Sequence, residues 1–278
     1  MLNNTIDFIK YYGVDIKKKF GQNFLTDNNI IQKIIEAVDV QNDDIIIEIG
    51  PGLGALTQFL FAAKKLIAIE IDRDLTKILN ERFGSRTNFE IINADVLKLN
   101  LNELAASGSR LKIVSNLPYY ISTAVITKCL ELKNLDSITV MVQKEVGDRI
   151  FALPSTKSYG SLSVLAQFYS NLKVVTKVSP NCFIPRPNVE STVIKFTMKN
   201  ENHHGIDKKF LFEFVRCAFS KRRKTLVNCL SDFHGLSKQK ITDILIQNNL
   251  DKNIRGEALS LELFISLSKQ LQNSIRAN

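Results

Sequence analysis

The segment Asn116-Leu117-Pro118-Tyr119 combines groups that can hold the amino group of a flat base. The Asn116 side-chain oxygen and the Leu117 backbone carbonyl can accept both hydrogens of an exocyclic amine and favour a pyramidal nitrogen. Pro118 has no N–H to compete and stiffens the loop, while the Tyr119 ring offers a face on which the base can stack. An ordinary strand-to-helix turn fits the same four residues, so alone they leave both interpretations open.

This segment follows an apolar run, residues 111–115, that is typical of a buried strand. Open α/β sheets bind their ligands at the carboxyl ends of such strands. Similar runs alternate with segments of helical periodicity through the first two thirds of the chain, which predicts a parallel sheet with helices on both faces. The predicted strands are 45–49, 66–70, 89–92, 112–114 and 137–142, and the predicted helices are 28–38, 56–64, 73–83 and 124–132.

Two later apolar runs, 172–178 and 191–198, are expected to form an antiparallel strand pair that closes one edge of the sheet. Beyond a polar linker at 199–207 the strand pattern stops. His203 and His204 fall in this linker, where a loop is favoured over a metal site. Amphipathic helical patterns follow at 208–230, 237–250 and 259–271.

Glycines stand where the first predicted strand meets its following segment. Gly50, Gly52 and Gly54 would let a ligand press against bare backbone there. Because Gly50, Gly52 and Ala55 also satisfy the dinucleotide-binding fingerprint, the loop indicates an adenosine-containing cofactor without choosing between NAD and S-adenosylmethionine. Glu70 ends the second predicted strand, where a carboxylate suits ribose hydroxyls in either case.

Asp95 follows the third predicted strand, in Asn93-Ala94-Asp95. Its carboxylate can accept a hydrogen bond from the amino group of a bound adenine, although an isolated Asp at such a place is also typical of a helix N-cap. Polar groups at three successive strand ends outline one cofactor cleft. The fourth strand end then places Asn116 beside that cleft.

Composition limits the class of protein. The chain has 278 residues, of which 45% are hydrophobic and 23% charged, as in a soluble globular protein. No apolar run approaches the roughly 18 residues of a membrane helix, and residues 1–7 lack the features of a targeting peptide. We therefore expect a cytoplasmic protein. The four cysteines form no C-x-x-C pair, which argues against zinc and against a disulfide framework, so no metal is expected.

The net charge of +9 is unevenly distributed. Residues 208–278 hold 13 Lys and Arg against 6 Asp and Glu, so most of the excess lies in the C-terminal helical segment. A basic segment of this kind suggests a polyanionic partner, and a solvated basic face is the plainer alternative. Two clusters could contact nucleic-acid phosphates: Lys17, Lys18 and Lys19, and Lys221, Arg222, Arg223 and Lys224.

Together these motifs resemble the bacterial small-subunit rRNA adenine dimethyltransferases, the KsgA/RsmA family, from about Lys17 to the C-terminus. The erythromycin-resistance rRNA methylases and the mitochondrial dimethyltransferase/transcription-factor proteins are related to it. The matching segments occur in the family's order, and they are 20–25, 48–54, Glu70, 93–95, 116–119 with 121–123, 143–146, 183–189 and 220–226.

The resemblance implies a class I S-adenosylmethionine-dependent methyltransferase, with a Rossmann-like, mostly parallel sheet that has an antiparallel edge, plus a small all-α rRNA-binding domain. The expected division is an N-terminal arm over 1–16, a methyltransferase domain over 17–200 and a helical domain over 207–278. The implied S-adenosylmethionine ligands are Asn23, Leu25, Gly50, Gly52, Glu70, Asp95 and Asn116. Asn116, Leu117, Pro118 and Tyr119 would position the target base, with Phe183 on its other face. Residue type alone places Phe24 and Phe183 in the core.

The implied reaction is dimethylation of the N6 amino groups of two adjacent adenosines in a 3′-terminal hairpin loop of 16S rRNA, during small-subunit biogenesis. The implied partner is a pre-30S subunit, and we expect a monomer that does not bind membranes. The alternatives are a large-subunit rRNA methylase that confers antibiotic resistance and a non-catalytic nucleic-acid-binding factor on the same fold. An NAD dehydrogenase would leave residues 116–119 unexplained.

Two positions depart from the family's usual pattern. Tyr120 stands where the family often has Asn, which puts a polar role at that position in doubt. Asn188 replaces a commonly basic residue, so the loop around it would hold phosphate less strongly. Residues 1–16 lie outside the resemblance and are expected to form a mobile arm.

Overall fold

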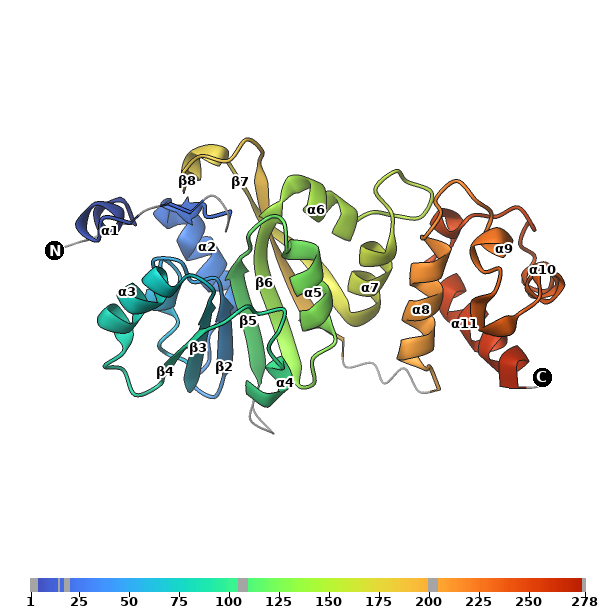
Figure 1. Ribbon diagram of the computed structural model, residues 1–278, viewed down its shortest axis with the longest axis horizontal. Helices are drawn as coiled ribbons and strands as arrows, with labels where there is room; N and C mark the ends of the chain where they lie inside the picture. The colour runs from blue at the N-terminus through green and yellow to red at the C-terminus, as the bar shows by residue number, and fades with distance from the viewer. Residues whose placement is uncertain (1–4, 15, 18–20, 105–109, 200–204, 277–278) are drawn as a thin grey trace. The chain divides into compact units, whose positions relative to one another are not determined.

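The computed structural model describes residues 5–14, 16–17, 21–104, 110–199 and 205–276 (Figure 1). The chain divides into two compact units. Unit 1 comprises Met1–Gly147 and Ser170–Met198, and unit 2 comprises Asp148–Tyr169 and Lys199–Asn278. Residues 1–16, expected as a separate arm, fall within unit 1, and the expected boundary near residue 200 differs from the observed one in one further respect. Residues 148–169, expected in the α/β domain, group with the C-terminal helices.

Unit 1 is built on a seven-stranded sheet in the order β4-β3-β2-β5-β6-β9-β7. The first five strands in this order are parallel, and β9 runs antiparallel to both of its neighbours. This confirms the expected mostly parallel sheet with an antiparallel edge. The strands are β2 (Ile45–Ile49), β3 (Lys65–Glu70), β4 (Phe89–Asn93), β5 (Leu111–Asn116), β6 (Leu135–Gln143), β7 (Ser170–Val178) and β9 (Ser191–Met198).

Burial explains why the central strands have continuous apolar sequences. Every residue of β2 is buried, because helices cover both faces of a parallel sheet. The register aligns the carboxyl ends of the strands: Ile49 pairs with Ile69 and with Ser115, and Glu70 pairs with Asn93. The segments that follow these strands therefore meet at one edge of the sheet.

The helices of this part of the chain are α1 (Thr5–Tyr11), α2 (Asn28–Val38), α3 (Arg73–Phe83), α4 (Leu101–Leu104), α5 (Ser122–Leu130) and α6 (Lys144–Ile150), the last of which ends in unit 2. The bounds of α2 and α3 are those that the periodicity predicts. Both begin after an aspartate whose side chain accepts backbone N–H groups of the first turn, Asp27 for α2 and Asp72 for α3.

The helix predicted over 56–64 is wrong, because the chain forms only a 3₁₀ turn at η2 (Thr57–Phe59). Its backbone bonds are i→i+3, from the Phe59 N–H to the Leu56 carbonyl and from the Leu60 N–H to the Thr57 carbonyl, and one long i→i+4 bond joins Gln58 to Gly54 at 3.4 Å. Leu56, Leu60 and Ala63 are nonetheless buried. Their spacing suits an α-helix, and successive tight turns bury the same side chains.

The N-terminal segment, expected as a mobile arm, contains α1 and packs on unit 1. Phe8 and Ile9 contact an apolar cluster formed by Phe24, Leu53 and Leu75. Further along, β1 (Phe24–Leu25) pairs antiparallel with β8 (Phe183–Ile184) in a separate two-stranded sheet. The chain after α1 is thus held at β1 by a segment about 160 residues away in sequence.

Unit 2 is helical, with α7 (Ser161–Tyr169), α8 (Lys208–Ala218), α9 (Leu226–Cys229), α10 (Lys238–Gln247) and α11 (Leu261–Arg276). Aromatic side chains form much of its core: Phe168 packs edge-on against Phe212, and Phe214 lies 5.3 Å from Phe264 between ring centroids. The stretch predicted as one helix over 208–230 is broken after Ala218. The backbone at Gly256 presses on the end of α8, since a Cβ there would lie 2.7 Å from the Ala218 carbonyl oxygen.

Within the described ranges, none of the helices has the length and apolar character needed to cross a membrane. The same residues contain no group of three or more His, Cys, Asp or Glu side chains suited to a metal ion. His203 and His204, expected in a loop, lie outside the described residues.

Candidate functional site

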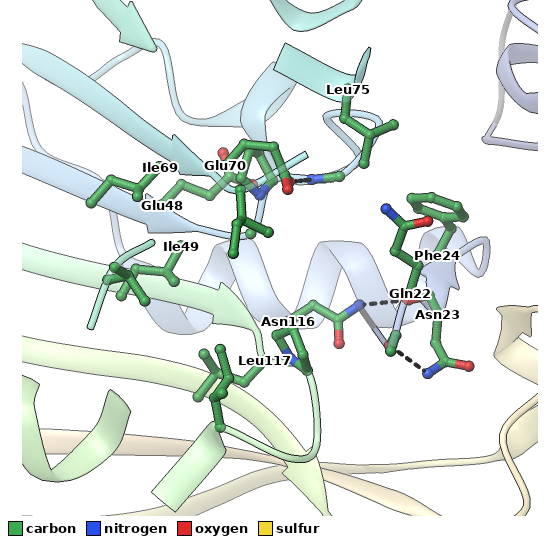
Figure 2. A pocket seen from close by; sticks show the side chains of 18 of the residues that line it. Gln22, Asn23, Phe24, Glu48, Ile49, Ile69, Glu70, Leu75, Asn116 and Leu117 are labelled. Carbon is green, nitrogen blue, oxygen red and sulfur yellow. Dashed lines mark hydrogen bonds between the residues drawn. The ribbon is translucent and has the colours of Figure 1, made fainter. Parts of the chain in front are cut away.

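A pocket with a cavity volume of about 160 Å³ opens at the carboxyl edge of the sheet in unit 1 (Figure 2). Its walls come from the segments after β2, β3, β4 and β5, and from Gly21–Leu25, which we call the strap. The pocket brings together all the residues predicted to bind a cofactor and four of the five predicted to position a base: Asn23, Leu25, Gly50, Gly52, Glu70, Asp95, Asn116, Leu117, Pro118 and Tyr119.

The glycine loop after β2 exposes bare backbone to this pocket. Gly50 and Gly52 have φ angles of +66° and +60°, which favour glycine. A Cβ at Gly50 would meet nothing closer than the Asn116 carbonyl oxygen at 3.9 Å. The space beside Gly50 is therefore left open for a ligand. Gly54 serves packing instead, because a Cβ there would lie 2.7 Å from the Phe83 ring.

Glu70, at the end of β3, is 5% exposed and forms part of the wall. Its carboxylate accepts the backbone N–H of Asp72 at 2.9 Å and of Gly52 at 3.2 Å. Burial raises the pKa of Glu70 to about 7, against the pull of these two N–H groups. Glu70 thus joins the glycine loop to the start of α3 and keeps further lone pairs for ligand hydroxyl groups.

A second buried carboxyl, Glu48 in β2, lies in the same wall. Burial raises its pKa to about 8, and it accepts a 2.6 Å hydrogen bond from the Thr57 hydroxyl. Its function is structural, because the bond ties β2 to the turn that follows the glycine loop. The role of Thr57 cannot be predicted from the sequence, because no periodicity marks a buried hydroxyl.

Asp95 caps a turn rather than a helix, and it also faces the pocket. Its Oδ1 accepts the backbone N–H of Leu97 at 2.9 Å, as a turn-capping aspartate does. The residue also lines the pocket. Among the described residues no group bonds to its Oδ2, so the capping bond leaves one oxygen available to a ligand.

Asn116 ends β5 and reaches from the sheet to the strap. Its Nδ2 donates to the backbone carbonyl of Asn23 at 2.9 Å, as Figure 2 shows. This bond determines the orientation of the amide, so that Oδ1 is the atom left to accept hydrogen bonds. Next to it, the Leu117 N–H donates to the Met141 carbonyl at 3.2 Å and fixes the loop on β6.

Two tyrosines of the same loop differ in their environment. Tyr119 is half-buried, and its hydroxyl is 3.0 Å from the Ser191 hydroxyl. Burial raises the pKa of Tyr119, so the phenol is neutral at ordinary pH. Tyr120 is 63% exposed and also lines the pocket, and its ring lies against Gly21 of the strap. The aromatic ring at position 120 is thereby explained as a packing partner of the strap.

Phe183 does not reach the pocket. Its side chain is 3% exposed and packs in the apolar cluster that includes Leu25, Val178 and Val193. Residue type alone predicts this core position, and the stacking role implied by the resemblance stays a prediction. Phe24, the other phenylalanine in question, is buried and also lines the pocket, against Gly52.

The predicted phosphate-binding clusters are only partly available to a ligand. In unit 2, Lys221, Arg223 and Lys224 are exposed in the loop between α8 and α9, whereas the Arg222 guanidinium bonds to Glu257 at 3.0 Å and to the Lys157 carbonyl. In unit 1, the Lys17 ammonium lies 2.6 Å from both Asp72 and Asp74. Lys18 and Lys19 lie outside the described residues.

The chain is similar to known proteins over almost its whole length. A family model described as ribosomal RNA adenine dimethylase matches residues 13–271. Ribosomal RNA small subunit methyltransferase A of Alkaliphilus metalliredigens is 44% identical over 276 residues, which is 97% of this chain and 96% of that protein. The protein of the same name from Clostridium acetobutylicum is 43% identical over 271 residues, 96% of this chain and 98% of the relative.

Two solved structures share the fold. A dimethyladenosine transferase from Plasmodium falciparum has a TM-score of 0.73 at 24% identity, over 90% of this chain and 98% of that one. The 23S rRNA methyltransferase ErmE has a TM-score of 0.66 at 24% identity, over 90% of this chain and 100% of its own. Both confirm the Rossmann-like methyltransferase fold. Since the family model spans nearly the whole sequence and the relatives match it almost end to end, the chain belongs to the ribosomal RNA adenine dimethylase family.

Proposed function

We propose that the protein transfers methyl groups from S-adenosylmethionine to the N6 amino groups of two adjacent adenosines in a 3′-terminal hairpin loop of 16S rRNA. The family supports an rRNA methyltransferase, and the names of the full-length relatives support the small subunit as its substrate. The observation that carries the proposal is the orientation of Asn116, whose Oδ1 remains available beside a pocket lined by Glu70 and the glycine loop.

The residues present fit S-adenosylmethionine. The open space next to Gly50 would admit the cofactor close to the backbone, and the buried Glu70 carboxylate would accept the ribose hydroxyls. Asp95 has an oxygen left for the adenine amino group. Asn23 and Leu25 line the pocket from the strap. We infer that these residues, with Gly52 and Asn116, form the cofactor site.

The bound cofactor would supply a methyl group already activated by its sulfonium charge, so the protein's task is alignment. Asn116 Oδ1 and the Leu117 carbonyl would accept the two hydrogens of the adenine amino group and direct its lone pair toward the methyl carbon. Tyr119 would stack on the base, with its ring held by the hydroxyl contact to Ser191.

Neither Asn116 Oδ1 nor the Leu117 carbonyl is basic enough to remove a proton before attack. Both would instead hold the hydrogens in place while the bond from nitrogen to the methyl carbon forms and the bond from that carbon to sulfur breaks. The methylated nitrogen would then be positively charged and acidic, and would lose its proton to solvent water. A neutral acceptor pair is compatible with a second transfer, because a monomethylated amine still offers one hydrogen to either oxygen.

The same proposal places the protein in the cytoplasm, as a monomer that meets its rRNA within a pre-30S subunit. The three exposed basic residues Lys221, Arg223 and Lys224 would contact rRNA phosphates. The alternative of a large-subunit methylase shares the fold, and the full-length relatives named for the small subunit favour the first substrate.

The test is transfer of tritiated methyl groups from S-adenosylmethionine to unmodified small subunits, followed by mapping of the modified nucleosides. We expect dimethyladenosine at two adjacent positions near the 3′ end of 16S rRNA. Unmodified large subunits serve as the matched substrate control. Label on the large subunit alone would overturn the substrate, and absence of label on both would overturn the activity.

A further inference from the structure

Four side chains link the strap, and the segment just before it, to the start of α3. The Lys17 ammonium lies 2.6 Å from Asp72 Oδ1 and 2.6 Å from Asp74 Oδ2. The Gln22 side chain donates through Nε2 to Asp72 Oδ2 at 2.9 Å and accepts the Lys17 backbone N–H at 2.8 Å. We call Lys17, Gln22, Asp72 and Asp74 the clasp.

Asp72 is the centre of the clasp and lies directly behind the cofactor wall, two residues after Glu70, which lines the pocket. Its side chain is 3% exposed, and its backbone N–H donates to the Glu70 carboxylate at 2.9 Å. Gln22 lies in the strap and lines the same pocket. A short path of bonds therefore joins the proposed ribose-binding carboxylate to the strap, through Asp72 and Gln22.

The electrostatic environment of Lys17 argues against a second role for its charge. Two carboxylates face the single ammonium group, and they raise the pKa of Lys17 above its usual range. The pKa values of Asp72 and Asp74 are both lowered, with Lys17 as the chief favourable contact of each. An rRNA phosphate at this place would have to displace two carboxylates that already neutralise the lysine.

We propose that Lys17 and Gln22 are positioning residues of the cofactor site, which hold the strap over the pocket through Asp72. Lys17, which sequence analysis assigned to rRNA, is on this proposal a contact within the protein. The strap carries Asn23, whose carbonyl orients Asn116, so the clasp acts on cofactor affinity and on the acceptor amide together. This inference rests on the proposed function, because it takes S-adenosylmethionine as the ligand beneath the strap.

The decisive variant is Lys17→Met, which removes the charge and keeps the apolar stem. Lys77→Met is the matched control, because the Lys77 ammonium lies 3.8 Å from Asp74 Oδ1 but touches neither Gln22 nor Asp72 among the described contacts. Lys17→Arg restores the charge. Thermal melting of each variant first establishes that it folds.

Three measurements separate the clasp from an rRNA contact. By calorimetry, Lys17→Met should weaken S-adenosylmethionine binding about fivefold or more, while Lys77→Met should stay within about twofold of the parent protein, as expected for an exposed pair. Lys17→Arg should recover most of the affinity. In the protein without cofactor, the amide hydrogens of residues 21–25 should exchange faster in Lys17→Met than in the parent protein. In Lys77→Met they should exchange at the parent rate.

The third measurement is the salt dependence of binding to an rRNA hairpin. On this proposal Lys17→Met leaves the slope of log K against log salt unchanged. A slope reduced by about 0.7 to 0.9 with unchanged cofactor affinity would show that Lys17 binds phosphate and would overturn the clasp. Unchanged exchange at 21–25 would overturn it as well. Failure of the parent protein to bind S-adenosylmethionine would instead overturn the proposed function, and the exchange experiment would still decide the clasp.

Discussion

The side chain of Asn116 and the backbone of Asn23 are joined by a 2.9 Å hydrogen bond in which the Asn116 amide is the donor. Asn116 follows β5 and Asn23 lies in the strap, 93 residues earlier in the chain. Because the Asn116 nitrogen is bonded to the strap, the Oδ1 atom is the part of the amide that remains available to a substrate. The bond makes the strap part of the acceptor site as well as a wall of the pocket.

Asn116→Ala should lower methyl transfer about a hundredfold, the scale of loss when a reacting group is misplaced by an ångström. The cofactor site keeps Glu70 and the glycine loop, so binding of S-adenosylmethionine should weaken much less than turnover. Asn116→Asp is the informative companion, because it retains acceptor oxygens but cannot donate to the Asn23 carbonyl. Single-turnover transfer and calorimetric binding measure the two effects, and turnover near the parent rate in Asn116→Ala would refute the assignment.

The raised pKa of Glu70 predicts a pH dependence of cofactor affinity. Ribose hydroxyls donate to the carboxylate, so binding favours the ionised form, and protons compete with the ligand below the pKa of about 7. Affinity should therefore rise as pH increases toward 7 and level off above it, by up to about tenfold per pH unit on the acid side. Calorimetric titrations between pH 5.5 and pH 8.5 would measure the profile.

Glu70→Gln is the control for this profile, because it cannot ionise. Its affinity should be weak and independent of pH. The variant also tests stability. The pKa of Glu70 in the folded state lies above the ordinary 4.5, so the folded protein binds more protons than the unfolded chain does between these values. The protein therefore loses stability as pH rises from about 4.5 to about 7. Glu70→Gln should lack this loss. A pH profile that persists unchanged in Glu70→Gln would assign the titration to another group.

Two glycines of one loop should respond differently to alanine. Gly54→Ala would place a Cβ 2.7 Å from the Phe83 ring at a φ of +83°, and should cost about 2 to 4 kcal/mol of stability from overpacking and backbone strain together. Gly50→Ala should lower stability by only about 1 kcal/mol, from backbone strain alone, because the space beside Gly50 is open. Its Cβ would occupy the proposed cofactor space, so cofactor affinity should fall. Urea unfolding measures the stability of each variant, and calorimetry measures its cofactor affinity. Equal losses of stability in Gly50→Ala and Gly54→Ala would contradict the different roles assigned to these glycines.

Arg222 and Arg223 are adjacent, and we expect them to have different functions. Arg223→Ala should reduce the slope of log K against log salt for rRNA binding by about 0.7 to 0.9, which corresponds to the loss of one phosphate contact. Stability should change little. Arg222→Ala removes the bonds to Glu257 and to the Lys157 carbonyl, so it should lower the melting temperature and leave the salt slope nearly unchanged. Titrations at several salt concentrations, beside thermal melts, measure both. The reverse pattern would show that Arg222 is the phosphate contact.

The sequence was sufficient for the sheet and for the pocket wall because both depend on local patterns. Fully buried strands require continuous apolar runs, and parallel strands bring their ends to one edge, so Glu70, Asp95 and Asn116 could be placed together before any coordinates. The aspartates that precede α2 and α3 set the starts of these helices.

Contacts over long sequence separations could not be predicted in this way. The pairing of β1 with β8 and the ion pair between Lys17 and Asp72 join segments with no shared periodicity. Periodicity also led to one wrong helix, over 56–64. The spacing of Leu56, Leu60 and Ala63 suits an α-helix, but tight turns bury the same side chains. For Phe183, residue type predicts the buried position, because a large apolar side chain beside β1 is most stable inside the core.

The discontinuous make-up of the two units has a consequence for synthesis on the ribosome. The chain passes from one unit to the other at 147–148, 169–170 and 198–199. Helix α7 therefore emerges before its partners α8 and α11, which lie after residue 199. Six of its nine residues are buried in the finished protein, so the nascent chain displays an apolar surface until the C-terminal helices are made. At about 5 to 20 residues per second, that interval lasts several seconds, in which a chaperone can bind.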